Sequence, residues 1–166
     1  MSTPDVSSCR RIVTGIGSDG RSRVVADGPS PYIKEALGYI DFAEQWLTPS
    51  PPPRAGEAFV DIAAEAPEGL EPDDPCGTLL RTSVYQPDPS DWSLENSMHA
   101  SKTVDYVFGL YGEMVCIFDD GEVTVRQGDV MIQRGTRHAW SNRTDRPAML
   151  GFVMVGAVDH GPEERA

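Results

Sequence analysis

Short segments in which apolar and polar residues alternate with a period of two follow one another along most of the chain. Residues 10–28, "RRIVTGIGSDGRSRVVADG", place two such runs around a Gly-Ser-Asp-Gly turn, which predicts a β-hairpin. Residues 78–87, "TLLRTSVYQP", alternate in the same way. From residue 97 to 157 four runs, "VDYVFGL", "EMVCIFDDGEVTVRQGDVMIQ", "RHAWSN" and "PAMLGFVMVGA", are separated by glycine-rich or polar turns. This spacing predicts an all-β sandwich or barrel.

Residues 31–48, "PYIKEALGYIDFAEQWLT", allow two interpretations. Their apolar spacing fits a short helix over 32–38, while 39–47 alternate as a strand does. Prolines make residues 49–56 and 66–77 surface loops. We therefore expect a flexible N-terminus (1–8), a single domain (9–157) and a polar C-terminal tail (158–166), with extra N-terminal strands and possibly one short helix.

The length and charge of the chain limit its possible partners. Its 166 residues suit one domain with a real core. A formal net charge of −12 repels phosphate backbones and anionic lipids, so we expect neither nucleic acid nor membrane as a partner. Three cysteines without CxxC spacing favour a reducing compartment, and no signal-peptide-like or membrane-spanning apolar segment occurs. These features predict a cytoplasmic protein.

Two of the three histidines are candidates for chemistry, since His160 lies in the polar tail. His99 precedes Asp105 by six residues, and only a turn between them would bring both to one ion. His138 would have to arrive from another strand. Two imidazoles and one carboxylate would leave open positions on a first-row metal ion. The same three side chains also fit structural roles in a core or a turn, and spacing alone leaves both interpretations open.

Strand alternation predicts which other side chains share the pocket. Trp140 and Asn142 have the parity of His138, although Trp140 would equally serve as barrel filling. We expect Val107 and Tyr111 on the face of Asp105, and Gln133 at the cavity mouth. The alternate residues Tyr106, Phe108 and Leu110 are expected to face a second layer of core, and Cys116 to be a buried thiol.

The segment from Met98 to Asn142 resembles the two motifs of the cupin superfamily, over about sixty residues. In the first motif His99 matches the first histidine, Asp105 stands where a glutamate is usual, and Ser101 replaces the second histidine. The second motif runs from a Gly-Asp turn at residues 128–129 to His138 and Asn142, with Arg134 before the glycine where proline is usual.

This resemblance implies a double-stranded β-helix, a jelly-roll barrel that holds a metal ion in its mouth. The implied ligands are His99, Asp105 and His138, the ion is Fe, Mn, Zn or Ni, and the substitution at Ser101 weakens binding. His138 and Asp105 would be the catalytic residues, and Ser101 would join the substrate pocket. We expect a small-molecule enzyme of decarboxylase, lyase, isomerase or cyclase type. The alternatives are an Fe(II) dioxygenase and a non-catalytic binding domain; by analogy with the superfamily we expect a homodimer.

Overall fold

The computed structural model describes residues 4–50, 60–61, 63 and 77–157, and this part of the chain is built almost entirely from antiparallel strands. Residues 51–56 of the first predicted loop, most of the second loop and the C-terminal tail lie outside the described residues. The elements in chain order are η1 (Val6–Ser8), β1 (Arg10–Ile16), β2 (Ser22–Pro29), β3 (Ile33–Ala36), β4 (Ile40–Thr48), β5 (Thr78–Tyr85), α1 (Leu94–Ser97), β6 (Thr103–Tyr111), β7 (Glu113–Phe118), β8 (Gly121–Arg126), β9 (Val130–Arg134), β10 (Ala139–Ser141) and β11 (Ala148–Gly156). The all-β prediction is confirmed.

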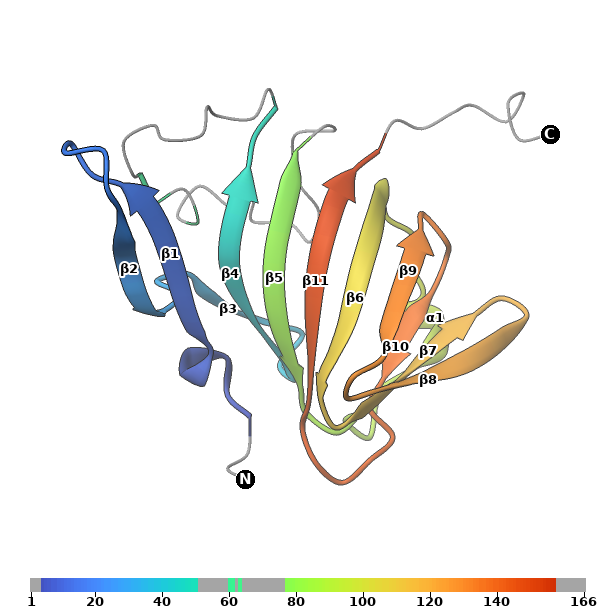
Figure 1. The fold of residues 1–166 in the computed structure, drawn as a ribbon. Helices are drawn as coiled ribbons and strands as arrows, with labels where there is room; N and C mark the ends of the chain where they lie inside the picture. Colours follow the sequence, from blue (N-terminus) through green and yellow to red (C-terminus); the bar gives the residue numbers. More distant parts are fainter. Residues whose placement is uncertain (1–3, 51–59, 62, 64–76, 158–166) are drawn as a thin grey trace, which may run out of the picture.

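The strands form three sheets. The largest has the order β3-β4-β5-β11-β6-β9, the second β10-β7-β8, and β1 and β2 pair as a separate hairpin. Figure 1 shows β4, β5, β11, β6 and β9 side by side across the molecule, with the β1–β2 hairpin on one flank and β7, β8 and β10 on the other. One apolar cluster takes residues from both larger sheets, including Leu79, Phe152, Met114 and Cys116. The main core therefore lies between these two sheets.

Strand β6 shows how alternation in the sequence becomes two faces of a sheet. Asp105 and Val107 are buried, whereas Tyr106 and Phe108 between and beyond them are exposed. Gly109 is the next residue on the buried face, and here the backbone of β6 lies against the turn that follows β8. A Cβ atom on Gly109 would lie 1.9 Å from the carbonyl oxygen of Arg126. The sequence needs glycine here because the backbones approach too closely for any side chain.

The ambiguous segment 31–48 forms a pair of strands, so the structure excludes the helix that its apolar spacing allowed over 32–38. Strands β3 and β4 pair antiparallel, with Ala36 opposite Ile40. Leu37 and Gly38, which join them, have φ values of 58° and 73°, outside the right-handed helical region. A short helix forms instead at Leu94–Ser97, where the hydroxyl of Ser93 accepts a hydrogen bond from the backbone of Asn96.

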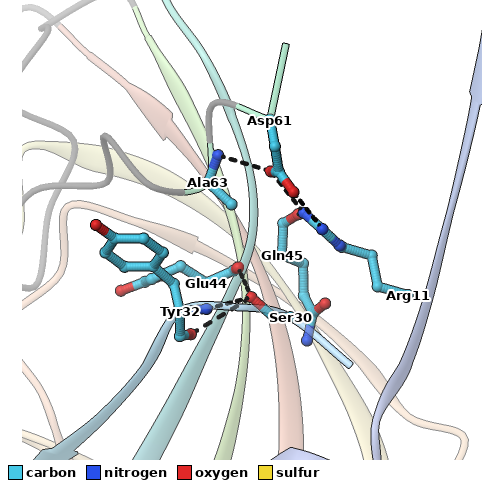
Figure 2. A network of polar contacts seen from close by, with 7 residues as sticks. All are labelled: Arg11, Ser30, Tyr32, Glu44, Gln45, Asp61 and Ala63. Atoms are coloured by element: carbon cyan, nitrogen blue, oxygen red, sulfur yellow. Dashed lines mark hydrogen bonds and ion pairs between the residues drawn. The ribbon is translucent and has the colours of Figure 1, made fainter. Parts of the chain in front are cut away.

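Polar contacts join the N-terminal hairpin to the large sheet, as Figure 2 shows. The guanidinium of Arg11 in β1 binds both carboxylate oxygens of Asp61 at 2.9 and 2.5 Å and donates to the backbone oxygen of Gln45 in β4. The hydroxyl of Ser30 donates to the backbone oxygen of Glu44. Val6, in the expected flexible N-terminus, is 3% exposed and packs against the outer face of the sheet. The hairpin and residues 6–8 thus extend the barrel on one side.

The outer face of the large sheet carries a row of apolar side chains that are exposed or partly exposed. Leu80, Val153, Tyr106 and Ile132 lie opposite one another across β5, β11, β6 and β9. Phe108 and Val130 form a second pair beside them. Tyr106, Phe108 and Leu110 are 42%, 37% and 40% exposed, so the expectation that they face a second core layer is wrong. No element described here covers this face of β6 and β9.

The buried position of Cys116 predicts that its thiol is unreactive in the folded protein. The thiol is inaccessible in β7, and burial raises its pKa to about 12. Because the thiolate is the reactive form, we expect Cys116 in a Cys9→Ser/Cys76→Ser variant to resist Ellman's reagent at mildly alkaline pH until denaturant is added. The partly buried Cys9, measured in a Cys76→Ser/Cys116→Ala variant, is the control and should react faster than Cys116 in the folded protein. Rapid labelling of folded Cys116 would contradict the packing of β7.

Candidate functional site

A cavity of about 480 Å³ opens on the inner face of the large sheet. Its wall combines residues of β4, β5, β6, β9 and β11 with residues of β10 and of the segment after α1. The side chains that line it are Ala36, Leu37, Tyr39, Ile40, Phe42, Arg81, Ser83, Tyr85, Asn96, Ser97, His99, Ala100, Ser101, Asp105, Gln133, His138, Trp140, Phe152 and Met154. Such a volume matches a small-molecule site.

His99 and His138 meet in an isolated antiparallel bridge at the wall of this cavity. The backbone nitrogen of each residue donates to the backbone oxygen of the other, at 2.8 Å in both directions. This bridge holds the segment before β6 against the start of β10. Gly135, with a φ of 58°, makes the turn that leads to His138, and its nitrogen donates to the oxygen of Thr103. The two imidazole rings therefore lie together, with centroids 4.3 Å apart.

Each imidazole is oriented by the same local contact. Nδ1 of His99 lies 2.9 Å from the oxygen of Ser97, and Nδ1 of His138 lies 2.8 Å from the oxygen of Thr136. A carbonyl oxygen only accepts hydrogen bonds, so Nδ1 carries the proton in both rings and Nε2 of the neutral ring keeps its lone pair. Burial lowers the pKa of His138 to about 4, so this ring is neutral at neutral pH.

This arrangement fits two metal-ligating histidines, because such ligands commonly donate their other ring nitrogen to a backbone carbonyl. Asp105 and Ser101 line the same cavity, and the hydroxyl of Ser101 accepts a hydrogen bond from Thr103. Within the described part of the chain, however, no three His, Cys, Asp or Glu side chains gather closely enough to hold one ion. The residues present fit an ion held by the two imidazoles, and Asp105 as a third ligand stays a prediction.

Asp105 and Gln133 form a second polar patch in the wall. They lie directly opposite each other on β6 and β9, and they are 4% and 3% exposed. Opposed residues of an antiparallel pair have Cβ atoms about 5 Å apart. The cavity thus presents a carboxyl group and a carboxamide side by side, separate from the histidine pair.

Aromatic side chains form much of the remaining wall. Trp140, the pocket wall predicted by alternation, packs edge-to-face against His138 and Phe152, with centroids 6.2 and 6.0 Å away. Phe42 and Tyr39 add further flat surface on the side of β4. A mainly apolar wall with a few polar groups favours a ligand with a flat, apolar body.

One group of pocket residues comes from the N-terminal half, in which the sequence shows no chemical motif. Arg81 of β5 is 3% exposed, binds the fully buried Glu44 and lies over the ring of Phe42, with its Cζ 4.6 Å from the centroid. Tyr85 is also buried in the wall, and desolvation raises the pKa of its phenol well above the usual value. The alternation of β5 puts Arg81, Ser83 and Tyr85 on one face. This alternation is the feature of the sequence from which their shared position could have been predicted.

Two residues expected in the pocket lie outside its lining. Val107 shares the inner face with Asp105, but it is completely buried in the main core. Tyr111 packs on the opposite face of the sheet, with Val84 and Met149. A β-bulge causes this difference: Met149 pairs with Tyr111 and Leu150 with Gly109, so one residue of β6 is extra and the alternation changes.

Asn142 also lies outside the pocket lining, where its side chain holds the corner between β10 and β11. Its Nδ2 donates to the backbone oxygens of Tyr85 and Arg146, at 3.0 and 2.8 Å. Its Oδ1 accepts from the backbone nitrogen and the hydroxyl of Thr144. Strand alternation placed Asn142 on the face of His138. The strand ends at Ser141, however, and the amide of Asn142 instead bonds backbone groups of the turn that follows.

Comparison with known proteins agrees with the fold. A family model described as "Cupin domain" matches residues 84–156. A cupin-domain-containing oxidoreductase, srdD, of Neurospora crassa is 35% identical over 84 residues, which are 50% of this chain and 40% of that protein. A second, fogC of Aspergillus ruber, is 25% identical over 155 residues, or 90% of this chain and 71% of that protein. Phomopsin biosynthesis cluster protein D of Diaporthe leptostromiformis is 38% identical over 71 residues, covering 42% and 35%.

Among solved structures, a putative ethanolamine utilization protein Q from Salmonella typhimurium superposes with a TM-score of 0.47 at 9% identity, covering 91% of this chain and 98% of that one. The chain spans about two fifths or less of the length of the first curated relatives it matches. Residues 84–156 nevertheless match the cupin domain, which supports the resemblance of this part of the chain to the cupin superfamily. The jelly-roll prediction is thereby confirmed. In the described residues no helix has the length and apolarity needed to cross a membrane.

The role of Asn142 can be tested by stability. In Asn142→Leu the buried oxygen of Tyr85 and the groups of the turn lose their partners, and we expect the free energy of unfolding to fall by about 3 kcal/mol. Urea denaturation followed by circular dichroism measures this change. Asp145→Asn, an exposed change in the same turn, should stay within about 0.5 kcal/mol of wild type. Wild-type stability of Asn142→Leu would show that the corner does not depend on this amide.

Proposed function

We propose that this chain is a small-molecule enzyme that carries out a redox-neutral reaction, of lyase, isomerase, cyclase or decarboxylase type. Its substrate has an apolar or aromatic body and carries one or two carbonyl or carboxyl oxygens. The observation that carries this proposal is the pair of touching imidazoles whose Nδ1 protons are held by backbone carbonyls in a mainly apolar cavity. Nε2 of each neutral ring thereby keeps a free lone pair that can bind a metal ion or accept a proton.

His99 and His138 would hold a divalent ion of Fe, Mn, Zn or Ni, with Asp105, the acidic side chain of the pocket lining, as the proposed third ligand. Such an ion supplies Lewis-acid polarisation of a substrate oxygen. Asp105, 4% exposed in the wall, or His138 would move the substrate proton. Trp140 and Phe152 would orient the apolar body and exclude water from the reacting atoms.

The second candidate is an Fe(II)-dependent oxidation. It is favoured by the curated relatives, three of which are named cupin-domain-containing oxidoreductases. Relatives from the phomopsin and oryzines biosynthesis clusters support a small-molecule substrate for either reaction. Oxygen dependence separates the two candidates, because the redox-neutral reaction proceeds without O₂.

We also propose that two copies pair through the outer face of β5, β11, β6 and β9. The central row of this face, Leu80, Val153, Tyr106 and Ile132, contains no acidic residue. The chain carries a net charge of −12, so most approaches between two copies meet electrostatic repulsion. An apolar face without acidic side chains reduces this repulsion and allows apolar surface to be buried between two copies.

The metal prediction is tested by elemental analysis of protein purified without chelator. We expect about one equivalent of divalent metal in the wild type and its loss in His99→Ala and in His138→Ala. The chain's third histidine provides the matched control: His160→Ala should keep the metal. Circular dichroism would check that each variant remains folded.

The outcomes of this experiment separate the candidate functions. Iron lost from both variants, together with substrate-dependent oxygen uptake, would replace the redox-neutral reaction with the oxidation. Zinc, manganese or nickel, with turnover in the absence of oxygen, would support the proposal. Ligand binding that persists unchanged in metal-free protein without turnover would overturn it in favour of a binding domain.

The pairing prediction is tested by light scattering after size-exclusion chromatography. The wild type should have twice the mass of one chain, and Val130→Glu/Ile132→Glu should convert it to monomers, because two charges then face the partner. Val24→Glu, an equally exposed position on β2, should remain paired. A monomeric wild type would contradict the proposal, as would a charged variant that still pairs.

A further inference from the structure

The buried carboxamide of Gln133 is a polar group of the pocket to which the reaction described above gives no role. Its residue is 3% exposed, and within the described chain neither Nε2 nor Oε1 has a hydrogen-bond partner. The side chain nonetheless belongs to the cavity wall. A buried amide without partners costs free energy in the folded state. Such a cost is expected where a protein keeps a polar group for a ligand.

The position of Gln133 narrows the kind of ligand group that would satisfy it. Along the edge where Oε1 and the nearer Nε2 hydrogen lie side by side, the amide offers one acceptor and one donor in a single plane. The complement of this edge is a ligand group with one donor and one acceptor side by side. Asp105 lies directly opposite on β6. A ligand carboxylate at this place would bring a second acidic group beside Asp105, which disfavours an anionic edge. A neutral edge avoids this conflict.

We propose that Gln133 is a specificity-determining residue that recognises a neutral donor–acceptor edge, as in the N–H and C=O of a lactam. The proposal rests on the proposed function in one respect, since it takes this cavity to be the substrate site. The terminal torsion of a glutamine side chain is broad, so the amide can turn into the cavity when a ligand enters. Trp140 and Phe152 then hold the flat body to which the lactam belongs.

A second buried glutamine provides the matched control. Gln45 of β4 is 7% exposed, and its Nε2 donates to the hydroxyl of Thr82 at 2.8 Å. Gln45 is not part of the cavity lining. The two buried residues thus differ in two linked features: the amide of Gln45 has a partner inside the protein and lies away from the cavity, whereas that of Gln133 has none and lines the cavity. Replacing each by leucine therefore separates a structural amide from one kept for a ligand.

The test uses 2-quinolone, a flat lactam, and N-methyl-2-quinolone, which has a methyl group in place of the donor. Calorimetric titration of the wild type should give about tenfold tighter binding of 2-quinolone. In Gln133→Leu the two affinities should agree within about twofold, while Gln45→Leu should keep the tenfold preference. Urea denaturation should show Gln133→Leu as stable as the wild type or more so, and Gln45→Leu less stable.

Several results would overturn the assignment. These are failure of 2-quinolone to bind the wild type, equal affinity for both probes, or a preference that survives in Gln133→Leu. A loss of stability in Gln133→Leu as large as in Gln45→Leu would show a structural amide instead. The readout is binding without turnover and without metal, so the proposed reaction can fail while this recognition is upheld, and the reverse also holds.

Discussion

The pocket depends on the backbone bridge between His99 and His138. Two hydrogen bonds of 2.8 Å tie the segment that leads into β6 to the start of β10, which belongs to the other sheet. The bridge brings together two imidazoles that are 39 positions apart in the sequence. It also orients them, because each Nδ1 donates to a carbonyl two residues earlier in its own segment. A side-chain contact alone would leave both rings free to rotate away from the cavity.

The pocket wall divides into parts with different chemistry. The histidine pair lies on the bridge, the Asp105–Gln133 pair lies on β6 and β9, and aromatic rings from β4, β10 and β11 separate polar groups from the core. The buried ion pair of Glu44 and Arg81 lies on a further side. Such a pair adds little net stability, but it fixes the orientation of a guanidinium in an otherwise apolar wall. Different sides of the cavity therefore carry different chemical groups, which allows the pocket to discriminate between similar small molecules.

The N-terminal half of the chain contributes more than cover for the barrel. Residues of β4 and β5 form one side of the pocket, although this part of the sequence carries no recognisable motif. Their role depends on pairing partners that are distant in sequence: β5 lies between β4 and β11. The face of a strand can be predicted from alternation, but the cavity that the face meets depends on which strands become its neighbours.

By itself the sequence determined the all-β class, the hairpin of residues 10–28, the strands of the C-terminal half and the candidate histidines, because these depend on period-two patterns, turn residues and a motif of local spacing. Tertiary structure decided the rest. The bulge opposite Leu150 turned Tyr111 to the outer face, the corner after β10 used the amide of Asn142, and strand pairing overrode the helical spacing of residues 32–38. Each of these outcomes depends on which backbone groups meet in the folded chain, and the periodicity of a single segment contains no information about those partners.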